Sequence, residues 1–578
     1  MWFGVFYWLA NYKWKVIFER LIWVACCVTL VNYMFYGTEM GMISSNLQYE
    51  SRMSFKLSAQ LLNLLVVTII ALACFYIATK YKTIVIRSLF IALIAIFSMC
   101  MLNGLTIKKS IDDIVLDSQD FERPKFQLSK TGKNVVVIVP DRALGQAVPY
   151  ILKEKPYLEG TFDGFTYYNN TISFGRATNF GFPAIAGGYE YTPLEMNKRN
   201  TESLVEKHNE ALKVLPVLFD QNGYDVTVCD PAYANYKWIP DLSIYDDYPR
   251  IKSFITNYIT KSGAFHNPSL KLLEIDNKCR TFFCFGIMKT MPLFMQPTIY
   301  NEGRYNQSIN LNYSVQVQHN ISFSEGIDSR FMNAYNVLDN LADITQIKDT
   351  GDTFLFLYSD ITHAPTLLQT PDYIPSIIVN NKEYDKTHNE RFFANGVKLK
   401  VNNNSQMSHY HANMAFFIQI GEWLDYLKEN GVYDNTRIIL VSDHGFSLAM
   451  QDEMMVQSSE NYYTDMGAFY PLLMVKDFYE KGFSSSSEFM TNADVPYIAV
   501  KGIIEDAKNP FSGKPIISEK EKNHRQYIVL SEGDEWRLEY NKGNEFSPTK
   551  WIVSGNNIFS KDNWIFINEK TTRPDIVN

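Results

Sequence analysis

Carboxylate and imidazole side chains follow three short apolar runs of this sequence. Asp141 comes after NVVVIV and a proline, Asp360 and His363 follow TFLFLY, and Asp443 and His444 follow RIILV. Hard oxygen ligands combined with imidazole suit a divalent metal ion such as Mn²⁺ or Zn²⁺. A single Asp after a strand is common in α/β proteins, whereas Asp-His-Gly at that place is more specific. Together, the three groups predict a metal site.

The apolar runs before these residues have the composition of buried strands. A continuous β-branched stretch such as 134–139 is typical of a strand that is covered on both faces. Similar runs lie at 225–229, 353–358, 437–441 and 471–475. Helical periodicity is present at 211–222 and 412–430, so the pattern predicts an α/β fold with a mostly parallel sheet flanked by helices. Ligands bind beyond the carboxyl ends of such strands, so we expect the carboxylate and imidazole groups that follow these runs to lie together along one edge of the sheet.

Three uncharged apolar stretches, 21–38, 57–79 and 88–107, occupy the start of the chain. Each approaches or exceeds the length that crosses a hydrocarbon core of ~30 Å. Three such stretches in succession favour a bundle of transmembrane helices over buried core helices. We therefore expect the membrane as a partner of this protein.

The basic residues beside these stretches predict their orientation. Three precede the first stretch and three separate the second from the third, whereas two lie between the first and the second. The positive-inside tendency then places the N-terminus in the cytoplasm and everything after residue 107 outside. The sequence thus predicts a multi-pass protein of the cytoplasmic (inner) membrane with an extracytoplasmic catalytic domain.

Chain length and composition suggest several domains. The 578 residues are 46% apolar and 20% charged, and the net charge of −8 with no basic segment argues against nucleic acid as a partner. We expect a membrane domain at 1–107, a linker at 108–133, a catalytic domain at 134–515 and a small β-rich subdomain at 516–578. The serine run 484–487 is expected to be a loop.

The seven cysteines do not form a disulfide framework or a zinc ribbon. A single bond between Cys279 and Cys284 is left open by the sequence.

Two other segments allow more than one interpretation. Phe282–Tyr300 is apolar, but Pro292 and Pro297 would break a spanning helix there. This segment is either an amphipathic insertion that rests on the membrane or roofs the site, or ordinary core. His409 and His411 precede the second predicted helix, where they either bind a donor or acceptor head group or lie in an exposed loop.

Three motifs resemble the sulfatase-like branch of the alkaline phosphatase superfamily, which includes arylsulfatases, lipoteichoic acid synthases and lipid A phosphoethanolamine transferases. They are NVVVIVPD (134–141), TNFGFPAIAGG (178–188) and YDNTRIILVSDHG (433–445), in the family's order. The likeness covers roughly 130–515, and the third motif is the most specific. It implies an alkaline-phosphatase-like fold, and the apolar N-terminal stretches match the membrane transferases of this branch.

The resemblance also implies a set of ligands for one divalent metal ion. Asp141, Thr178, Asp443 and His444 match that set, with Mn²⁺ or Zn²⁺ expected and Mg²⁺ or Ca²⁺ as alternatives. The lipoteichoic acid and phosphoethanolamine enzymes usually carry Glu at the first of these positions, whereas sulfatases and phosphatases carry Asp. Thr178 is also the implied nucleophile and would open a helix.

Substrate contacts are implied around the nucleophile. His363, in THAP, resembles the histidine that contacts the phosphoryl or sulfuryl group. Arg176 and Asn179 flank Thr178 and would steady the anion. Asp360 resembles part of a second metal site, but its spacing to His363 is one residue short, which favours one metal. Thr171 and Ser173 are alternative nucleophiles whose spacing to the following glycines fits less well.

The identity of the nucleophile separates the functions that the resemblance implies. Sulfatases oxidise Cys or Ser to formylglycine, and Thr cannot give that aldehyde. The preferred hypothesis is a transferase that moves phosphoglycerol or phosphoethanolamine from a membrane lipid donor to a surface glycan acceptor through a phosphothreonine. A hydrolase of sulfuric or phosphoric esters on envelope glycans is the alternative. A protein that only binds a glycan or an envelope partner is the third hypothesis, and the retained ligand residues argue against it.

Overall fold

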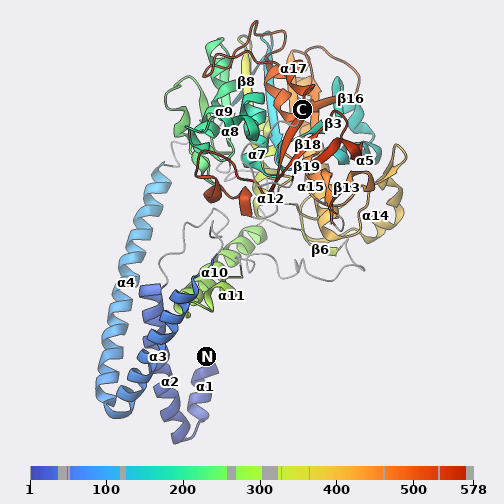
Figure 1. Ribbon diagram of the computed structural model, residues 1–578. Helices are drawn as coiled ribbons and strands as arrows, with labels where there is room; N and C mark the ends of the chain where they lie inside the picture. Colours follow the sequence, from blue (N-terminus) through green and yellow to red (C-terminus); the bar gives the residue numbers. More distant parts are fainter. Residues whose placement is uncertain are drawn as a thin grey trace. The chain divides into compact units, whose positions relative to one another are not determined.

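The computed structural model describes residues 2–36, 49, 53–117, 125–256, 268–301, 323–326, 329–363, 365–459, 462–531 and 534–567 (Figure 1). The chain divides into two compact units. The first, here called the helical unit, comprises 1–123 and 268–309, and the second, the sheet unit, comprises 124–267 and 310–578.

The helical unit contains two helices that are long and apolar enough to cross a membrane, Leu57–Lys80 and Lys82–Lys109. The second is part of a longer helix, so the predicted linker at 108–133 begins with ten helical residues up to Asp117. Of the predicted span 21–38, residues 21–31 form the second half of α2 and Asn32–Tyr36 a π-helical turn, whereas 37 and 38 lie outside the described residues. The described helices of this unit are α1 (Trp2–Leu9), α2 (Tyr12–Val31), α3 (Leu57–Lys80), α4 (Lys82–Asp117), α10 (Pro268–Thr290) and α11 (Gln296–Tyr300).

The inserted segment 282–300 belongs to the helical unit and is held there by buried amides. The Asn63 side chain donates to Asn32 Oδ1 at 2.8 Å, and Asn32 donates to the Thr290 carbonyl at 3.2 Å. The Leu293 backbone N–H donates to Asn63 Oδ1 at 3.0 Å. Both asparagines are fully buried, so each contact is made out of water. The insertion is therefore part of the apolar helices' own unit and not core of the sheet unit.

Cys279 and Cys284, which the sequence left open as a pair, are both free thiols.

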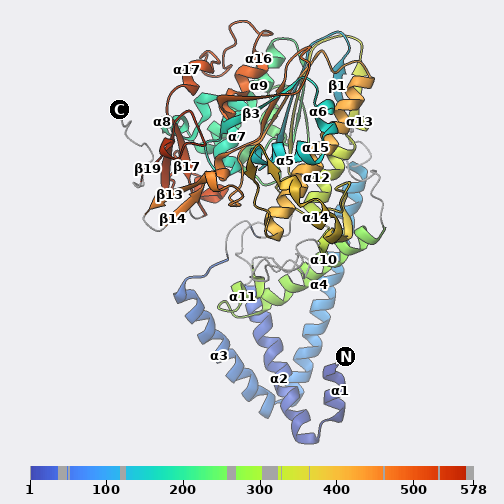
Figure 2. The ribbon, with the colours of Figure 1, turned by 90° about the vertical axis from the view of Figure 1, so that its right-hand side faces the viewer.

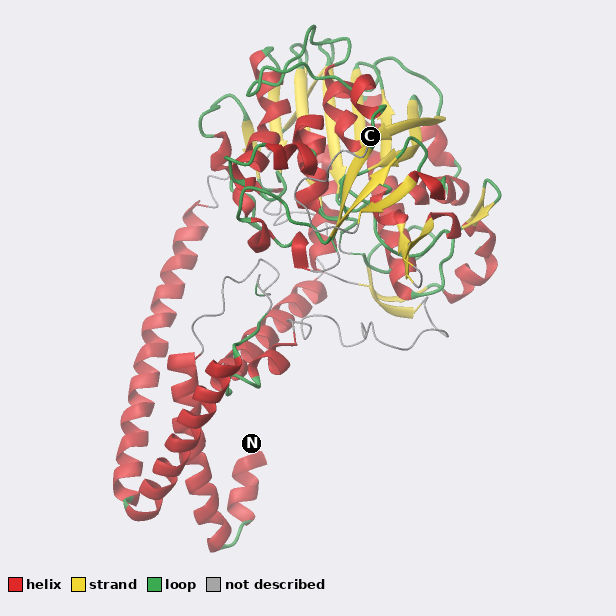
Figure 3. Ribbon diagram, viewed as in Figure 1, coloured by secondary structure: helices red, strands yellow, loops and turns green. Residues whose placement is uncertain are grey.

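The sheet unit is built on eight strands in the order β16-β3-β15-β12-β2-β8-β4-β5. The strands of this unit are yellow in Figure 3, with helices in red beside them. All neighbours pair in parallel except β15, which is antiparallel to both β3 and β12, so the predicted mostly parallel sheet is confirmed. The strands are β2 (Asn134–Pro140), β3 (Phe165–Ile172), β4 (Asp225–Cys229), β5 (Lys252–Phe254), β8 (Thr353–Ser359), β12 (Thr436–Val441), β15 (Leu473–Lys476) and β16 (Ser484–Thr491).

Helices cover both faces of this sheet, as Figure 2 shows. Along β2, Val136 and Ile138 belong to a core cluster with α5, α12 and α15, whereas Val135 and Val137 belong to a second cluster with α7, α9 and α16. Because side chains alternate across a strand, the continuous apolar run serves two cores. The helices are α5 (Val148–Glu154), α6 (Tyr157–Thr161), α7 (Thr178–Gly187), α8 (Pro193–Lys198), α9 (Leu204–Gln221), α12 (Ser329–Asp339), α13 (Leu341–Ile344), α14 (Lys382–Thr387), α15 (Asn404–Glu429), α16 (Val495–Val500) and α17 (Glu519–Lys522).

Smaller sheets extend this core. The three-stranded antiparallel sheet near the C-terminus lies inside the segment expected to be β-rich. Strand β1 lies inside the predicted linker and pairs in parallel with β7. The remaining strands are β1 (Phe126–Ser129), β6 (Phe323–Gly326), β7 (Thr345–Lys348), β9 (Ser376–Asn380), β10 (Phe393–Ala394), β11 (Val397–Lys398), β13 (Met455–Ser459), β14 (Tyr462–Asp465), β17 (Gln526–Leu530), β18 (Lys550–Ser554) and β19 (Trp564–Ile567).

Two expectations about these elements are wrong. The serine run 484–487 is not a loop but the start of β16, which pairs in parallel with β3 at the sheet edge. These serines are largely exposed, so burial imposes no apolar pattern on this part of the strand. The helix expected at 412–430 begins at Asn404, because the Asn403 side chain accepts the Gln406 backbone N–H and caps it. His409 and His411 therefore lie within a buried helix and not in an exposed loop.

Candidate active site

Three of the predicted metal ligands meet at the carboxyl edge of the sheet. Asp141 follows β2, and Asp443 and His444 follow β12, its parallel neighbour. One ligand atom from each side chain lies within 4.8 Å of the others, and all three side chains are buried. The His444 Nε2 atom is 3.8 Å from Asp141 Oδ1 and 3.7 Å from Asp443 Oδ2. The strand order thus brings together residues that are some 300 positions apart.

Backbone groups orient Asp443 and His444. Asp443 Oδ1 accepts the backbone N–H groups of Arg142, at 3.1 Å, and of His444, at 3.0 Å. This leaves Oδ2 directed to the cluster. His444 Nδ1 lies 2.6 Å from the Gly445 carbonyl, which can only accept, so Nδ1 carries the proton and Nε2 presents a lone pair. Such a fixed tautomer is typical of a metal-binding histidine.

The Asp141 carboxylate is buried beside a second negative charge. Its Oδ2 accepts the Tyr358 hydroxyl, and the Thr178 hydroxyl lies 3.5 Å away. Burial, with the charge of Asp443 added to it, raises the pKa of Asp141 to about 7. Burial also raises the pKa of Asp443, and burial lowers the pKa of His444 to about 4. The protein alone does not compensate the charge of two buried carboxylates here.

The donor atoms fit a divalent cation. Asp141 Oδ1 and Asp443 Oδ2 are buried and have no hydrogen-bond partner among the described residues. Buried anionic oxygens without partners are costly, whereas a cation among them would offset both charges. Two carboxylate oxygens and a neutral imidazole nitrogen suit Mn²⁺ or Zn²⁺. Members of the family described below bind a divalent metal, and this cluster is where one would be held; the geometry leaves the metal's identity open.

Thr178 begins the helix α7 at this cluster. Its side chain is buried, and its hydroxyl donates to Asp141 Oδ2 at 3.5 Å. The helix comes close to the metal-ligand turn at Gly181, where an added Cβ would lie 2.1 Å from the Asp443 carbonyl oxygen. Asn492 donates to that same carbonyl at 3.0 Å and to the Gly181 carbonyl at 3.3 Å. Only glycine allows α7 to place Thr178 this near.

Arg142 is a functional candidate that the sequence did not reveal. It has φ 67°, a left-handed conformation that is costly for a residue with a side chain. Its Nη2 donates to His363 Nε2 at 3.1 Å, and its guanidinium lies 4.5 Å from the centre of the Phe446 ring. The strained backbone sets a permanent cation beside the metal cluster, where an anionic substrate would need one.

The remaining predicted substrate residues lie at different distances from the cluster. His363 Nε2 is 3.9 Å from Asp141 Oδ2. Arg176 is half-buried and lowers the pKa of His444 by its charge, after burial and other causes. Asn179 is fully buried, and neither end of its amide has a partner among the described residues. Asp360 is exposed, and its charge, after burial and the charge of Asp141, helps to raise the pKa of Tyr358.

The two helical histidines differ in their surroundings. The His409 ring stacks on Phe446 with centroids 4.8 Å apart, and through Phe446 it is connected to Arg142. His411 accepts the Leu368 backbone N–H at 3.0 Å and meets the Tyr373 ring edge-on, which places it in the core beneath α15. A substrate-binding role for either stays a prediction, and the surroundings favour His409.

Tyr233 and Tyr358 complete the set of residues that the sequence did not indicate. Tyr358 is the sixth residue of the predicted strand TFLFLY, so its apolar context gave no signal. Tyr233 lies in the turn after β4 with φ 57°. Burial and then the charge of Asp141 raise the pKa of both hydroxyls, so both remain neutral donors.

A parallel α/β sheet with a carboxylate–histidine cluster at its carboxyl edge is the arrangement of a metal-dependent enzyme. The sequence model of the Sulfatase family matches residues 133–495, more than half of the chain. The chain belongs to the sulfatase family, which confirms the resemblance, and it is an enzyme of the hydrolase and phosphotransferase kind that this family contains.

Among solved structures, the chain is similar to the lipoteichoic acid synthase LtaP from Listeria monocytogenes, with 10% identity over 76% of this chain and 85% of that one, and a TM-score of 0.35. It is similar to the phosphonate monoester hydrolase of Agrobacterium radiobacter, with 12% identity over 76% and 89% and a TM-score of 0.37. It is also similar to the integral membrane phosphoethanolamine transferase EptA from Neisseria meningitidis, with 11% identity over 85% and 84% and a TM-score of 0.29. No curated protein matches the chain. These similarities are low, and the family assignment rests on the family match alone.

Proposed function

We propose that this protein is a membrane-anchored transferase of the cytoplasmic membrane. It moves a phosphoryl-linked head group, phosphoglycerol or phosphoethanolamine, from a lipid to a surface glycan. The observation that carries this proposal is Thr178, whose hydroxyl lies 3.5 Å from Asp141 at the start of α7. A threonine cannot become formylglycine, so the sulfate-ester hydrolysis of true sulfatases is disfavoured.

The residues around Thr178 supply what a phosphodiester substrate needs. A divalent cation held by Asp141, Asp443 and His444 would add Lewis acidity and offset charge on the phosphoryl group. Arg142 offers a guanidinium to the non-bridging oxygens, and the free amide of Asn179 offers a further donor. The first backbone N–H groups of α7 point out of the helix start and favour an anion there.

The proposed first half-reaction forms a phosphothreonine. Thr178 Oγ attacks phosphorus, its proton passes to Asp141 Oδ2, and the bond from phosphorus to the diacylglycerol oxygen breaks. When Arg142 turns from His363 Nε2 to the phosphoryl oxygens of the substrate, that nitrogen is free to carry a proton. The protonated His363 gives this proton to the leaving oxygen, so diacylglycerol leaves neutral. Asp141 Oδ2 lies 3.5 Å from the hydroxyl oxygen and accepts from it, so it is placed to take this proton.

The second half-reaction returns the enzyme to its starting state. A glycan hydroxyl gives its proton to His363 and attacks phosphorus. The bond from phosphorus to Thr178 Oγ breaks, and the threonine recovers the proton from Asp141. Atoms and protons then balance as lipid plus glycan hydroxyl giving diacylglycerol plus head-group-modified glycan.

The apolar helices support a lipid donor. Helices α3 and α4 hold the apolar segments Leu57–Lys80 and Lys82–Lys109, which are long enough to span a bilayer. An enzyme that such helices hold in the bilayer meets a lipid substrate by diffusion within the plane of the same membrane.

The test uses the full-length protein in vesicles of phosphatidylglycerol and phosphatidylethanolamine with Mn²⁺ and no glycan. We expect about one equivalent of diacylglycerol and a covalent adduct on residue 178, whose mass identifies the head group. Thr178→Ser should retain an adduct at this position, because it keeps a hydroxyl, and Thr178→Ala should lose it.

Two results would count against the proposal. Continuous release of free head group without a glycan would identify a hydrolase. An adduct that persists in Thr178→Ala would place the nucleophile elsewhere, with Thr171 and Ser173 as the next candidates.

A further inference from the structure

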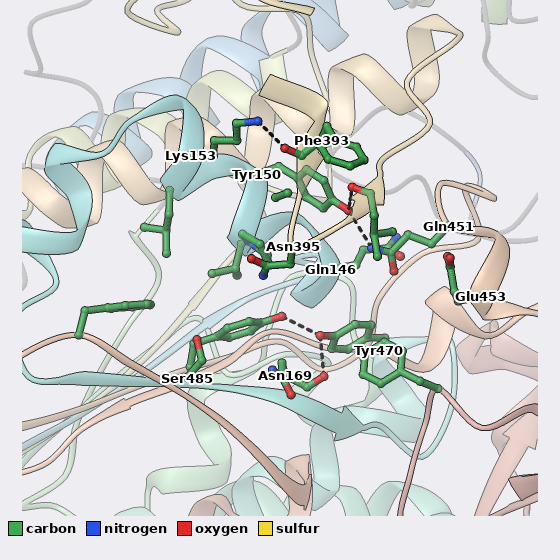
Figure 4. Close-up of a pocket in the computed structure, with 18 of the residues that line it drawn as sticks. Gln146, Tyr150, Lys153, Asn169, Phe393, Asn395, Gln451, Glu453, Tyr470 and Ser485 are labelled. Carbon is green, nitrogen blue, oxygen red and sulfur yellow. Dashed lines mark hydrogen bonds between the residues drawn. The ribbon is translucent and has the colours of Figure 1, made fainter. Parts of the chain in front are cut away.

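A cavity of about 810 Å³ lies in the sheet unit apart from the metal cluster (Figure 4). Its walls come from the α5 region, β3, the β10–β11 hairpin, the segment before β13 and the start of β16. None of the predicted catalytic or metal-binding residues lines it. Its size falls within the ~300–1,000 Å³ of small-molecule sites.

Gln146 is the buried polar group of this cavity. Only 3% of its surface is exposed, and neither its Nε2 nor its Oε1 atom has a hydrogen-bond partner among the described residues. Leaving the donor and the acceptor of this one buried amide unpaired costs roughly 1–3 kcal/mol. A ligand with a hydroxyl, which both donates and accepts, would satisfy the two ends of this amide.

The charges of the cavity do not favour an anion. Its one cation, Lys153, already donates to the carbonyl oxygens of Glu390 and Phe393. The carboxylates of Glu159 and Glu453 also line it, and both residues are exposed. With one committed cation and two anions, the cavity would repel a phosphate or sulfate group. Its ligand is therefore expected to be neutral.

Aromatic rings supply the rest of the surface. Tyr167 and Tyr470 join their hydroxyls at 2.6 Å, and each is tied further to a backbone carbonyl, so their rings are fixed. Phe393 and Phe559 remain 51% and 41% exposed and stand among the lining residues. Flat apolar faces beside side-chain amides match the two kinds of surface of a sugar ring, its C–H faces and its hydroxyl edges.

We propose that this cavity binds a neutral carbohydrate unit, at a distance from the reacting atoms. The further statement that this unit belongs to the acceptor glycan rests on the proposed function. The binding itself does not, because it requires neither the metal cluster nor Thr178.

The experiment measures binding of neutral trisaccharides to full-length protein in nanodiscs, which avoids the sugar head groups of common detergents. Chitotriose, maltotriose and mannotriose are the probes, followed by saturation-transfer NMR and calorimetry. We expect at least one to bind, with affinity reduced tenfold or more in Gln146→Leu. Phe559→Ala, an exposed rim position, should weaken binding in a protein whose core is untouched.

Gln419→Leu is the matched control, because Gln419 is also 3% exposed but lies on α15 outside the cavity, and it should bind as the parent does. Thr178→Ala should bind normally as well, so a failure of the transfer reaction would leave this result intact. If none of the three trisaccharides binds, or if Gln146→Leu and Phe559→Ala bind as tightly as the parent, the inference is wrong. Tighter binding of glycerol phosphate than of any trisaccharide would also overturn it.

Discussion

The metal cluster and the Gln146 cavity both keep buried polar atoms without partners, but of different kinds. In the cluster the unpaired atoms are Asp141 Oδ1 and Asp443 Oδ2, which only accept. In the cavity they are the donor and the acceptor of one amide. Unpaired anionic acceptors call for a cation, whereas a neutral donor–acceptor pair calls for a hydroxyl. The chemistry of the unpaired atoms therefore distinguishes the two sites.

The main-chain segments at Gly445 and Gly467 lie between the metal cluster and the Gln146 cavity. Gly445, next to His444, is so close to the chain that an added Cβ would lie 2.1 Å from the Gly467 carbonyl oxygen. A Cβ added to Gly467 would in turn lie 3.4 Å from Gln146 Nε2. The regions are neighbours that share no side chain, so substitutions in one should leave the other intact.

The largest expected effect is in the cluster, from Asp443→Asn. The amide keeps an oxygen for the two backbone N–H groups but removes the charge at Oδ2. We expect loss of bound metal and an activity decrease of about 10³-fold or more, because a metal ion contributes several kcal/mol to such reactions. Metal content by mass spectrometry and turnover of lipid give the result.

Removal of the metal should reverse the effect of Asp443→Asn, from a loss of activity to a gain in thermal stability. With a chelator present, Asp443→Asn relieves repulsion with Asp141 and should melt at a higher temperature than the parent, whereas Mn²⁺ should stabilise only the parent. Asp465→Asn is the control, since Asp465 is a buried carboxyl that accepts backbone N–H groups outside the cluster. Full metal occupancy in Asp443→Asn would exclude it from the ligand set.

Arg142 gives the next largest effect and separates charge from strain. Arg142→Ala and Arg142→Gly both remove the guanidinium, so both should lower turnover by about 10²–10³-fold while retaining metal. Glycine accepts φ 67° without cost, so the Gly variant should be more stable than the Ala variant by about 1–2 kcal/mol. Unfolding curves of the two variants supply this difference. Equal turnover in the parent and both variants would remove Arg142 from the site.

The sequence predicted the centre of the cluster better than its surroundings. Continuous apolar runs are a local signal, and they located β2, β8 and β12 together with the polar residues that follow each strand. The parallel pairing of these strands then required Asp141, Asp443 and His444 to meet. Residues that directly follow a recognisable strand can therefore be placed at the site from the sequence.

Residues that act through tertiary contacts were not within reach. Arg142 matters because its backbone turns left-handed, and Tyr233 because a turn after β4 brings it to Thr178. Gln146 lies on a short turn after β2 with no periodic pattern, and its significance appears only when its partners are searched in three dimensions. The Asn403 cap of α15 was a missed sequence signal, since Asn before a helix is a common start.

Gly445→Ala tests the main-chain contact between Gly445 and Gly467, and its effect on metal binding and stability should be intermediate. The added methyl group meets the Gly467 and Tyr470 carbonyl oxygens, so His444 must move. We expect metal affinity to fall by about 10–100-fold and stability to fall by about 1–3 kcal/mol. Metal titration and thermal unfolding measure the two quantities. Gly160→Ala, with no atom within 4 Å of the added group, should leave metal affinity unchanged. An unchanged affinity in Gly445→Ala would mean that the turn adapts without moving the ligand.

The smallest expected effect is in the cavity, and its sign opposes that of most core substitutions. Gln146→Leu removes two unpaired buried atoms at nearly constant volume, so the free protein should become more stable by roughly 1–3 kcal/mol. A bound trisaccharide at a hundred times the parent's Kd should stabilise the parent by about 2.7 kcal/mol, and a variant that binds ten times more weakly by only about 1.4 kcal/mol. Thermal unfolding of parent and variant, with and without saccharide, measures both the stability of the free protein and its stabilisation by the ligand. A variant that is less stable than the parent in both conditions would show that the amide has a structural role, and the cavity would then lose the group that selects its ligand.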